Sequence, residues 1–109
     1  METKQVLAAL AALAQESRLA TFRLLVEAGP AGMSASRIAE ALQIAPSSLS
    51  FHLKELSHAN LTVPRQEGRF IIYVANFDTM NALLGFLTAN CCGGNPCSLS
   101  RARPVMQVQ

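Results

Sequence analysis

Tryptophan is absent from this chain of 109 residues, tyrosine occurs once and cysteine only three times. Charged residues make up 15% of the chain and the formal net charge is +2, which excludes a strongly polybasic tail but leaves room for a local basic face. No apolar run approaches the roughly eighteen residues of a membrane span, and the N-terminus lacks the apolar run and cleavage site of a signal peptide. We therefore expect a cytoplasmic protein with no membrane partner.

The residue sets that most enzymes need are also missing. The sequence shows no Ser/His/Asp set, no glycine-rich phosphate loop and no paired carboxylates in an identifiable cleft. We expect a protein that is not an enzyme.

The three cysteines lie together at positions 91, 92 and 97. A disulfide framework would instead spread an even number of cysteines along the chain. Cys91, Cys92 and Cys97 therefore either form one local site or have no shared role.

Half of the residues are apolar, which is enough for the core of one domain. Helical spacing of apolar residues predicts helices at 4–14, 17–28, 34–42, 46–60 and 77–90. Ser34 is a candidate N-cap, Pro46 suits a first helical position, and Gly29-Pro30 ends the second helix. Two β-rich segments, 61–63 and 70–74, flank a polar stretch with a glycine and predict a hairpin.

The predicted fold is mainly α with a small β part (α+β). Its order is helix, helix, helix-turn-helix, β-hairpin and helix, which is the winged helix-turn-helix arrangement. We expect residues 1–90 to form the DNA-binding and dimerisation domain. Residues 91–109 would form a cysteine-containing C-terminal segment with a flexible tail.

The helix at 46–60 is the candidate recognition helix, the helix that enters the major groove of DNA. With Leu49, Leu53 and Leu56 turned to the core, short hydroxyls, an imidazole and a lysine remain near the exposed side. The candidate DNA contacts in this helix are Ser47, Ser48, Ser50, His52 and Lys54. The alternative for each residue is an ordinary polar surface, with His52 capping or packing locally.

The hairpin adds two candidate DNA contacts, Arg65 and Arg69, which we expect at its tip. In a wing these side chains would touch the phosphate backbone or the minor groove. The alternative is that they only keep an exposed turn soluble.

Four segments, at 13–19, 37–42, 47–56 and 65–69, resemble the ArsR/SmtB family of metalloregulatory repressors. The pattern Ser-x-His-Leu-Lys-x-Leu at 50–56, followed by the wing, carries most of this resemblance. The resemblance covers residues 5–90 and implies a homodimer built from the first and last helices, bound to a palindromic double-stranded operator. It also implies that an inducer loosens DNA binding, and that DNA binding itself needs no cofactor. The alanine-rich first helix and the last helix fit such a dimer independently, because each has more apolar surface than a monomer needs.

Two inducer sites common in that family are absent from this sequence. Where many arsenic sensors have a Cys-x-Cys pair, this chain has Ser34-Ala35-Ser36. Where zinc and nickel sensors use Asp and His on the last helix, this chain has Asp78 but no histidine.

The remaining candidate site is the three-thiol cluster of Cys91, Cys92 and Cys97. Soft thiolates select soft metals and metalloids, and trivalent arsenic or antimony takes three sulfurs in a trigonal pyramid. Zinc would need a fourth ligand, and none is evident nearby. Cadmium or lead would leave a negative site that Arg101 and Arg103 could offset.

We therefore expect a repressor that is released from its operator by As(III) or Sb(III). A thiol-redox repressor, a cadmium or lead sensor, and a winged-helix module that binds protein instead of DNA remain as alternatives.

Overall fold

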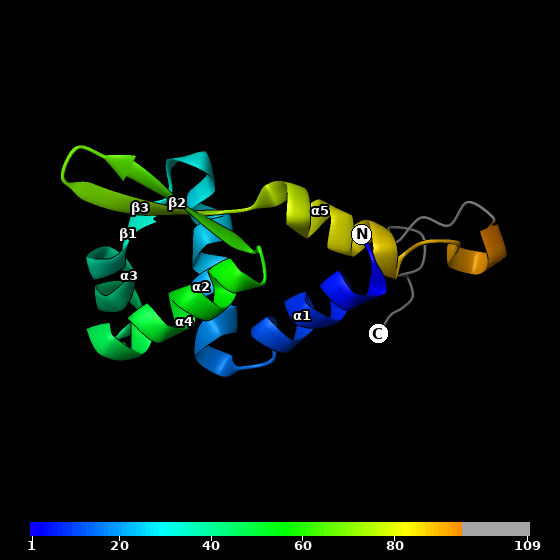
Figure 1. Cartoon of the computed structure of the whole chain (residues 1–109), viewed down its shortest axis with the longest axis horizontal. Helices are drawn as coiled ribbons and strands as arrows, with labels where there is room; N and C mark the ends of the chain where they lie inside the picture. The colour runs from blue at the N-terminus through cyan, green and yellow to red at the C-terminus, as the bar shows by residue number, and fades with distance from the viewer. Residues whose placement is uncertain (95–109) are drawn as a thin grey trace, which may run out of the picture.

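The computed structural model describes residues 1–94 (Figure 1). Its helices are α1 (Thr3–Leu13), α2 (Glu16–Ala28), α3 (Ala35–Leu42), α4 (Pro46–His58) and α5 (Phe77–Leu87), with two short 3-10 helices, η1 (Gly29–Ala31) and η2 (Cys91–Gly94). Its strands are β1 (Met33–Ser34), β2 (Thr62–Glu67) and β3 (Phe70–Ala75). This order confirms the predicted winged helix-turn-helix fold. No helix among residues 1–94 is long and apolar enough to span a membrane.

The helices begin and end where local side-chain chemistry allows. The side chain of Gln15 accepts a hydrogen bond from the Arg18 amide at the start of α2, and Asn76 does the same for Thr79 in α5. Gly29 follows α2 with a φ of 71°, a value that glycine adopts without strain. These local contacts account for where α2 and α5 begin and where α2 ends.

The three strands form one antiparallel sheet in the order β1-β3-β2. Strand β2 continues to Glu67, so the hairpin turn consists of Gly68 and Arg69 alone, and Arg65 lies inside the strand. The expectation that Arg65 sits at the hairpin tip was therefore wrong. Strand β1, which pairs Met33 with Tyr73, was not predicted, because two residues carry no periodicity of their own.

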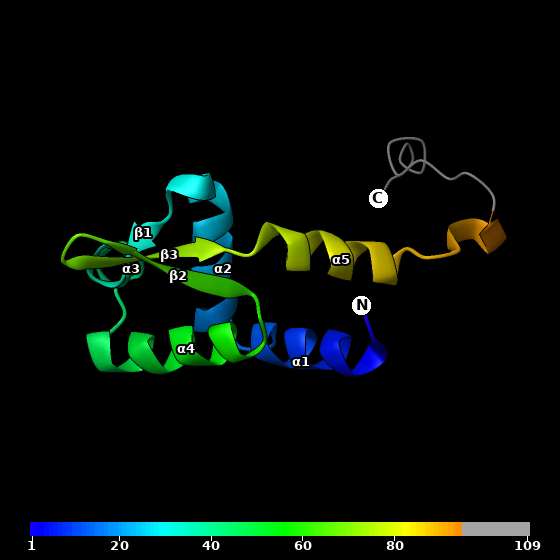
Figure 2. The same ribbon diagram turned by 45° about the horizontal axis from the view of Figure 1, so that its top comes forward.

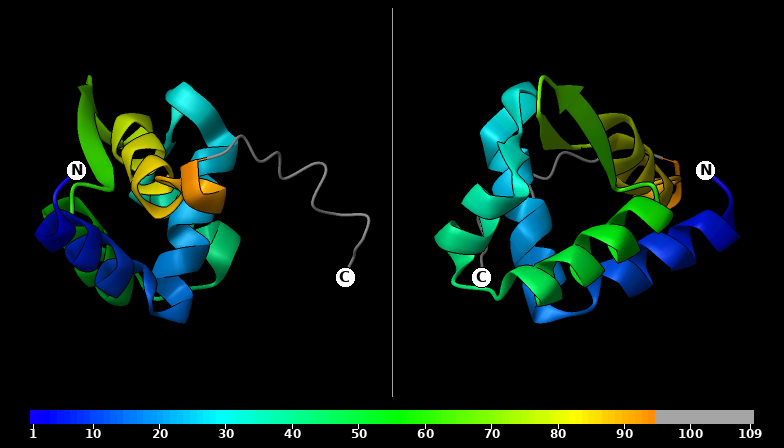
Figure 3. Two further views of the ribbon diagram at one scale, coloured as in Figure 1. Left: turned by 90° about the vertical axis from the view of Figure 1, so that its right-hand side faces the viewer. Right: turned by 60° about the vertical axis from the view of Figure 1, so that its left-hand side comes forward.

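The core is centred on α2, which packs against α1, α3, α4 and β3. Its largest fully buried apolar side chains are Leu25, Ile38, Leu49, Leu56 and Leu61. The views in Figures 2 and 3 show α2 running through the middle of the molecule, with the other elements around it. A single core therefore fixes the helix-turn-helix against the sheet.

Helices α1 and α5 lie side by side at one end of the molecule, and the hairpin turn and the start of α4 lie at the other (Figures 1 and 2). Helix α5 ends at Leu87, three residues before the predicted end at Asn90. The Thr88 hydroxyl donates to the Leu84 carbonyl and Asn90 has a φ of 57°, so the chain leaves the helical path there.

Candidate nucleic-acid interface

The turn between α3 and α4 holds the two helices of the helix-turn-helix in a fixed relation. The Ser34 hydroxyl caps α3 by accepting from the Arg37 amide at 3.4 Å. Gln43 then takes a left-handed conformation with a φ of 56°, and the Ile44 amide donates to the Ala39 carbonyl at 3.1 Å. Pro46 opens α4 as predicted, at a position where its missing N–H has no helical partner to lose.

Helix α4 presents one apolar face inward and one polar face outward. Leu49, Leu53 and Leu56 are between 0% and 3% exposed, as predicted from their spacing. The outward candidates are all exposed, namely Ser47, Ser48, Ser50 and Lys54. An α-helix turns by about 100° per residue, so burial of the leucines dictates this outward face. Whether these four residues contact DNA stays a prediction.

His52 occupies the boundary between the two faces and is half-buried. Its Nδ1 atom is buried and has no hydrogen-bond partner among residues 1–94. The hydrogen-bonding capacity that His52 can offer to an outside partner therefore lies at Nε2.

Phe51 is an exposed residue of α4 that the sequence reasoning did not include among the candidates. Its side chain is 55% exposed, and its ring meets the ring of His52 edge to face with centroids 5.9 Å apart. The signal was present in the sequence, because residue 51 lies opposite the leucines on a helix of 3.6 residues per turn. An apolar residue in a helix is easily assigned to the core unless its phase is compared with its neighbours.

The two wing arginines differ in their surroundings. The Arg65 guanidinium donates to the Pro30 carbonyl at 2.9 Å and to the Ala31 carbonyl at 3.1 Å, and forms an ion pair with Glu67 at 2.6 Å. It therefore ties β2 to the turn after α2. Arg69 lies in the exposed hairpin turn, beside Gly68, whose φ is 61°. Of the pair, Arg69 has the placement expected of a residue that touches a DNA backbone.

The cysteine segment begins at Cys91, the fourth residue after the end of α5. Cys91 and Cys92 are both exposed, and their sulfur atoms lie 3.4 Å apart. Cys92 has a φ of 57°, and Gly93 and Gly94 also have positive φ values, so the chain turns tightly here. Cys97, the third predicted ligand, lies outside the described residues, as do Arg101 and Arg103. Within residues 1–94 no group of three or more His, Cys, Asp or Glu side chains is placed to hold a metal ion.

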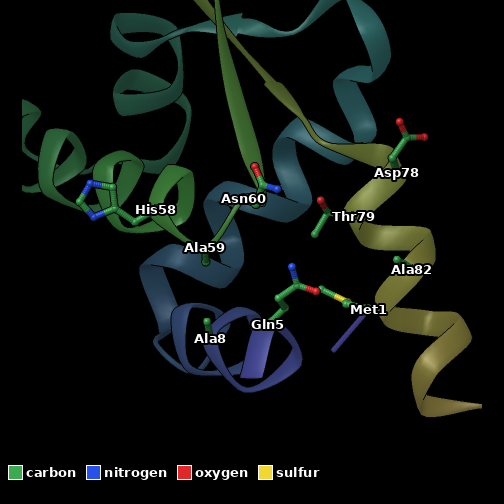
Figure 4. Close-up of a pocket in the computed structure, with 9 residues that line it drawn as sticks. All are labelled: Met1, Gln5, Ala8, His58, Ala59, Asn60, Asp78, Thr79 and Ala82. Atoms are coloured by element: carbon green, nitrogen blue, oxygen red, sulfur yellow. The ribbon is translucent and has the colours of Figure 1, made fainter. Parts of the chain in front are cut away.

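An open cleft of about 430 Å³ lies between α1, α5 and the end of α4 (Figure 4). Its two titratable side chains, His58 and Asp78, come from opposite walls, and most of the remaining lining consists of alanines and short polar residues. Such a lining offers no convergent acid, base or nucleophile of the kind that catalysis needs.

Comparison with known proteins supports the helix-turn-helix assignment. Residues 13–65 match a family described as a helix-turn-helix domain. No curated protein matches the sequence.

Several solved structures resemble the chain. An ArsR-like transcriptional regulator from Rhodococcus sp. RHA1 is 28% identical, with 77% of this chain and 76% of that chain covered and a TM-score of 0.70. A possible transcriptional regulator for arsenical resistance is 26% identical, with 74% and 81% covered and a TM-score of 0.62. The homodimeric winged helix-turn-helix DNA-binding domain of a possible ArsR-family regulator from Mycobacterium bovis is 24% identical, with 87% and 88% covered and a TM-score of 0.65.

These findings agree with the geometry of α3, α4 and the hairpin. With its winged helix-turn-helix fold, its match to a helix-turn-helix family over residues 13–65 and its similarity to ArsR-like transcriptional regulators, the chain is a DNA-binding transcription regulator and not an enzyme.

Proposed function

We propose that the protein is a homodimeric repressor that binds a palindromic operator in the cytoplasm and is released by trivalent arsenic or antimony. The inducer would bind the thiolates of Cys91, Cys92 and Cys97. DNA would be contacted by Ser47, Ser48, Ser50, His52 and Lys54 of α4 and by Arg65 and Arg69 of the wing.

The placement of α4 beside the wing supports DNA binding. The exposed serines lie in the first turns of α4, where a recognition helix meets base edges and phosphates. Lys54 adds a positive charge to the same outward face, and Arg69 adds another at the hairpin turn. A duplex lying across α4 could meet both charges at once. Arg65 could join these contacts only by exchanging part of its present bonding for phosphate.

Exposed apolar side chains on α1 and α5 support the dimer. Leu7 and Leu10 of α1 and Leu84, Phe86 and Leu87 of α5 are between 39% and 61% exposed. Exposed apolar side chains of this kind on two adjacent helices are typical of a surface that a partner protein buries. The similar domain from Mycobacterium bovis is homodimeric, which favours a second copy of this chain as the partner that buries this surface.

The spacing of Cys91 and Cys92 is the single observation that carries the inducer assignment. Their sulfurs lie 3.4 Å apart. Two sulfurs each about 2.3 Å from one soft centre, a typical metal–thiolate bond length, have this separation when they subtend an angle of about 95°. The pair is thus spaced as neighbouring ligands of one centre, and Cys97 follows closely enough in the sequence to supply the third.

The chemistry of three thiols favours trivalent arsenic. Arsenous acid and three thiols give a neutral tris-thiolate and three molecules of water, so no charge has to be compensated. Zinc would require a fourth ligand. Cadmium or lead bound by three thiolates would be negatively charged, and Arg101 and Arg103 are near in sequence to offset this charge.

Release from DNA would follow from the position of the cysteines directly after α5. Folding of residues 91–97 around arsenic would shift α5 in the dimer and so rotate the two helix-turn-helix units relative to each other. Half-site spacing on DNA is geometrically strict, so a small rotation weakens operator binding. A coupling free energy of about 1–3 kcal/mol is typical of such switches.

A thiol-redox repressor is the second candidate, because two exposed thiols in contact are also placed to react with oxidants. A disulfide between the adjacent Cys91 and Cys92 would be strained, so either cysteine would pair with Cys97.

The test is a mobility-shift titration of the reduced protein on the DNA upstream of its own coding sequence. We expect a complex that micromolar arsenite dissolves and zinc does not. A complex that persists under arsenite but dissolves with peroxide would assign the cysteines to redox sensing. Absence of any complex would contradict the operator assignment.

Cysteine variants locate the inducer site in the same assay. C91S, C92S and C97S should each bind the operator as the wild type does in the absence of arsenite, because none of the three cysteines belongs to α4 or to the wing. Each should resist release by arsenite. If all three variants still leave the DNA on arsenite addition, the three-thiol site is wrong.

A further inference from the structure

Phe51 is the largest side chain on the outward face of α4. Because an α-helix turns by about 100° per residue, residues 47, 51 and 54 form one stripe on the side opposite Leu49, Leu53 and Leu56. Phe51 is 55% exposed on this stripe, whereas Phe22 in α2 is 6% exposed. The ring therefore does not serve the core of the chain.

The surroundings of Phe51 are polar and carry charges of both signs, because Glu55 as well as Lys54 lies about one turn after it. Ser47 lies one helical turn before it, and Lys54 lies one turn after it. Ser50 precedes it directly and is also exposed. A single ring among hydroxyls and an ammonium group does not form a broad apolar patch, which a protein partner would need. It instead matches a polar surface with isolated apolar points.

The major groove of DNA is such a surface. Its base edges present donors and acceptors, its rims are phosphates, and the thymine C5-methyl group is its apolar feature. Phe51 is the sixth residue of α4, in the half of the helix that contacts base edges in helix-turn-helix proteins. Ser47 and Lys54 would meet polar groups and phosphate on either side of it.

The ring of Phe51 is supported before any DNA is bound. It meets the half-buried ring of His52 edge to face, with an angle of 64° between the two planes. His52 is held in place because part of its own ring, including Nδ1, is buried against the protein. A supported aromatic ring loses little conformational freedom on contact, which favours its use as a recognition element.

We propose that Phe51 recognises thymine in the operator by packing its ring against the C5-methyl group in the major groove. This inference rests on the proposed binding of DNA through α4 and adds a specificity determinant to it. The first half of α4, to which Phe51 belongs, lies at the opposite end of the molecule from α5, one of the two helices of the proposed dimer surface (Figure 1).

The test removes the methyl group from the DNA and leaves the protein unchanged. In a duplex that carries the operator, each thymine is replaced in turn by deoxyuridine, which lacks only the C5-methyl. Binding is measured by fluorescence anisotropy. We expect Kd to increase by about fourfold when one critical thymine in one half-site is substituted. The increase should be about fifteenfold when the corresponding thymines of both half-sites are substituted, because the burial of one methyl group per protomer is then lost.

Variants of Phe51 identify the side chain that makes the contact. F51A should bind the thymine operator with the weakened affinity that the wild type shows for the doubly substituted one, and it should not distinguish thymine from deoxyuridine. F51L should keep part of the discrimination. L19A is the matched control, because Leu19 is 44% exposed on α2, and it should discriminate as the wild type does.

The outcomes separate this inference from the function on which it rests. Wild-type protein that binds the operator with equal affinity at every thymine-to-deoxyuridine position overturns the thymine contact and leaves operator binding intact. Discrimination that F51A retains in full also overturns it, by assigning the methyl contact to another residue. If the wild type binds no duplex, operator binding and this inference both fail. Because the wild-type series needs no variant, the test stands even if F51A does not fold.

Discussion

Lys54 is the residue whose proposed role is simplest to isolate, because the sequence contains two lysines and the other, Lys4, lies on α1. An ammonium group on the outward face of α4 contacts phosphate by charge and carries little information on sequence. K54A should therefore weaken binding to all duplexes alike. The slope of log association constant against log salt concentration is negative, and K54A should make it shallower by about 1.8 for the two protomers together.

The control for this prediction is K4A, which removes the same charge from the first turn of α1. It should leave the slope unchanged. A slope for K54A equal to that of the wild type would show that Lys54 makes no phosphate contact.

Replacing the two wing arginines by alanine should affect different properties, DNA affinity for Arg69 and the stability of the DNA-free wing for Arg65. R69A should reduce operator affinity and the salt slope without altering the protein in the absence of DNA, because Arg69 lies in the exposed turn. R65A should loosen the wing of the DNA-free protein, because it removes the bonds to the Pro30 and Ala31 carbonyls. The loss in stability should stay within about 1 kcal/mol, since the pair with Glu67 is exposed.

Hydrogen exchange of the wing amides measures this difference directly. Faster exchange in R65A than in R69A is expected for β2. Equal exchange in both variants would contradict a positioning role for Arg65.

At the scale of elements, Gly32 is the point where the turn after α2 enters the sheet. It has a φ of 66°, and a Cβ there would lie 2.5 Å from the Tyr73 carbonyl oxygen of β3. G32A therefore adds a clash with backbone to an unfavourable conformation, and we expect it to lower the free energy of unfolding by about 3 kcal/mol.

Gly29 supplies the matched control, because it has a φ of 71° and open space around the Cβ position. G29A should lower the free energy of unfolding by about 1–2 kcal/mol, the conformational part alone. Urea denaturation of both variants checks the difference. Equal losses would show that the approach of β3 to Gly32 imposes no constraint.

The elements that could be predicted from the sequence are those with local causes. Ser34 caps α3 and Pro46 opens α4, and both are visible in the sequence as helix signals. Strand β1 escaped prediction because its formation depends on pairing with Ile72 and Tyr73 far along the chain. The extension of β2 to Glu67 also escaped, because its polar side chains resemble those of a loop.

The candidate site divides in the same way. The exposure of the α4 serines and of Lys54 follows from the phase of the buried leucines, which the sequence contains. The role of Arg65 depends on carbonyls more than thirty residues away in the chain. No local pattern encodes that contact.

At the scale of the whole molecule, the exposed leucines of α1 and α5 should decide whether a dimer forms. L84E places a charge where Leu84 is 54% exposed on the proposed dimer face, and burying that charge without a partner is unfavourable. We expect a monomer by light scattering and a loss of operator affinity of about 100-fold, because the second half-site no longer benefits from a high effective concentration.

L19E introduces the same charge at Leu19, which is exposed on α2. It should remain a dimer. A dimeric L84E with full operator affinity would place the dimer interface elsewhere.

The central claim is that inducer binding to the cysteines that follow α5 controls DNA binding by α4 and the wing at the other end of the molecule from α5 (Figure 1). The most direct test is the Kd of the reduced wild-type dimer for its operator duplex, measured with and without saturating arsenite. A coupled switch predicts a Kd raised by about 10- to 100-fold in the presence of arsenite. An unchanged Kd, with arsenite bound at one equivalent per protomer, would contradict the claim.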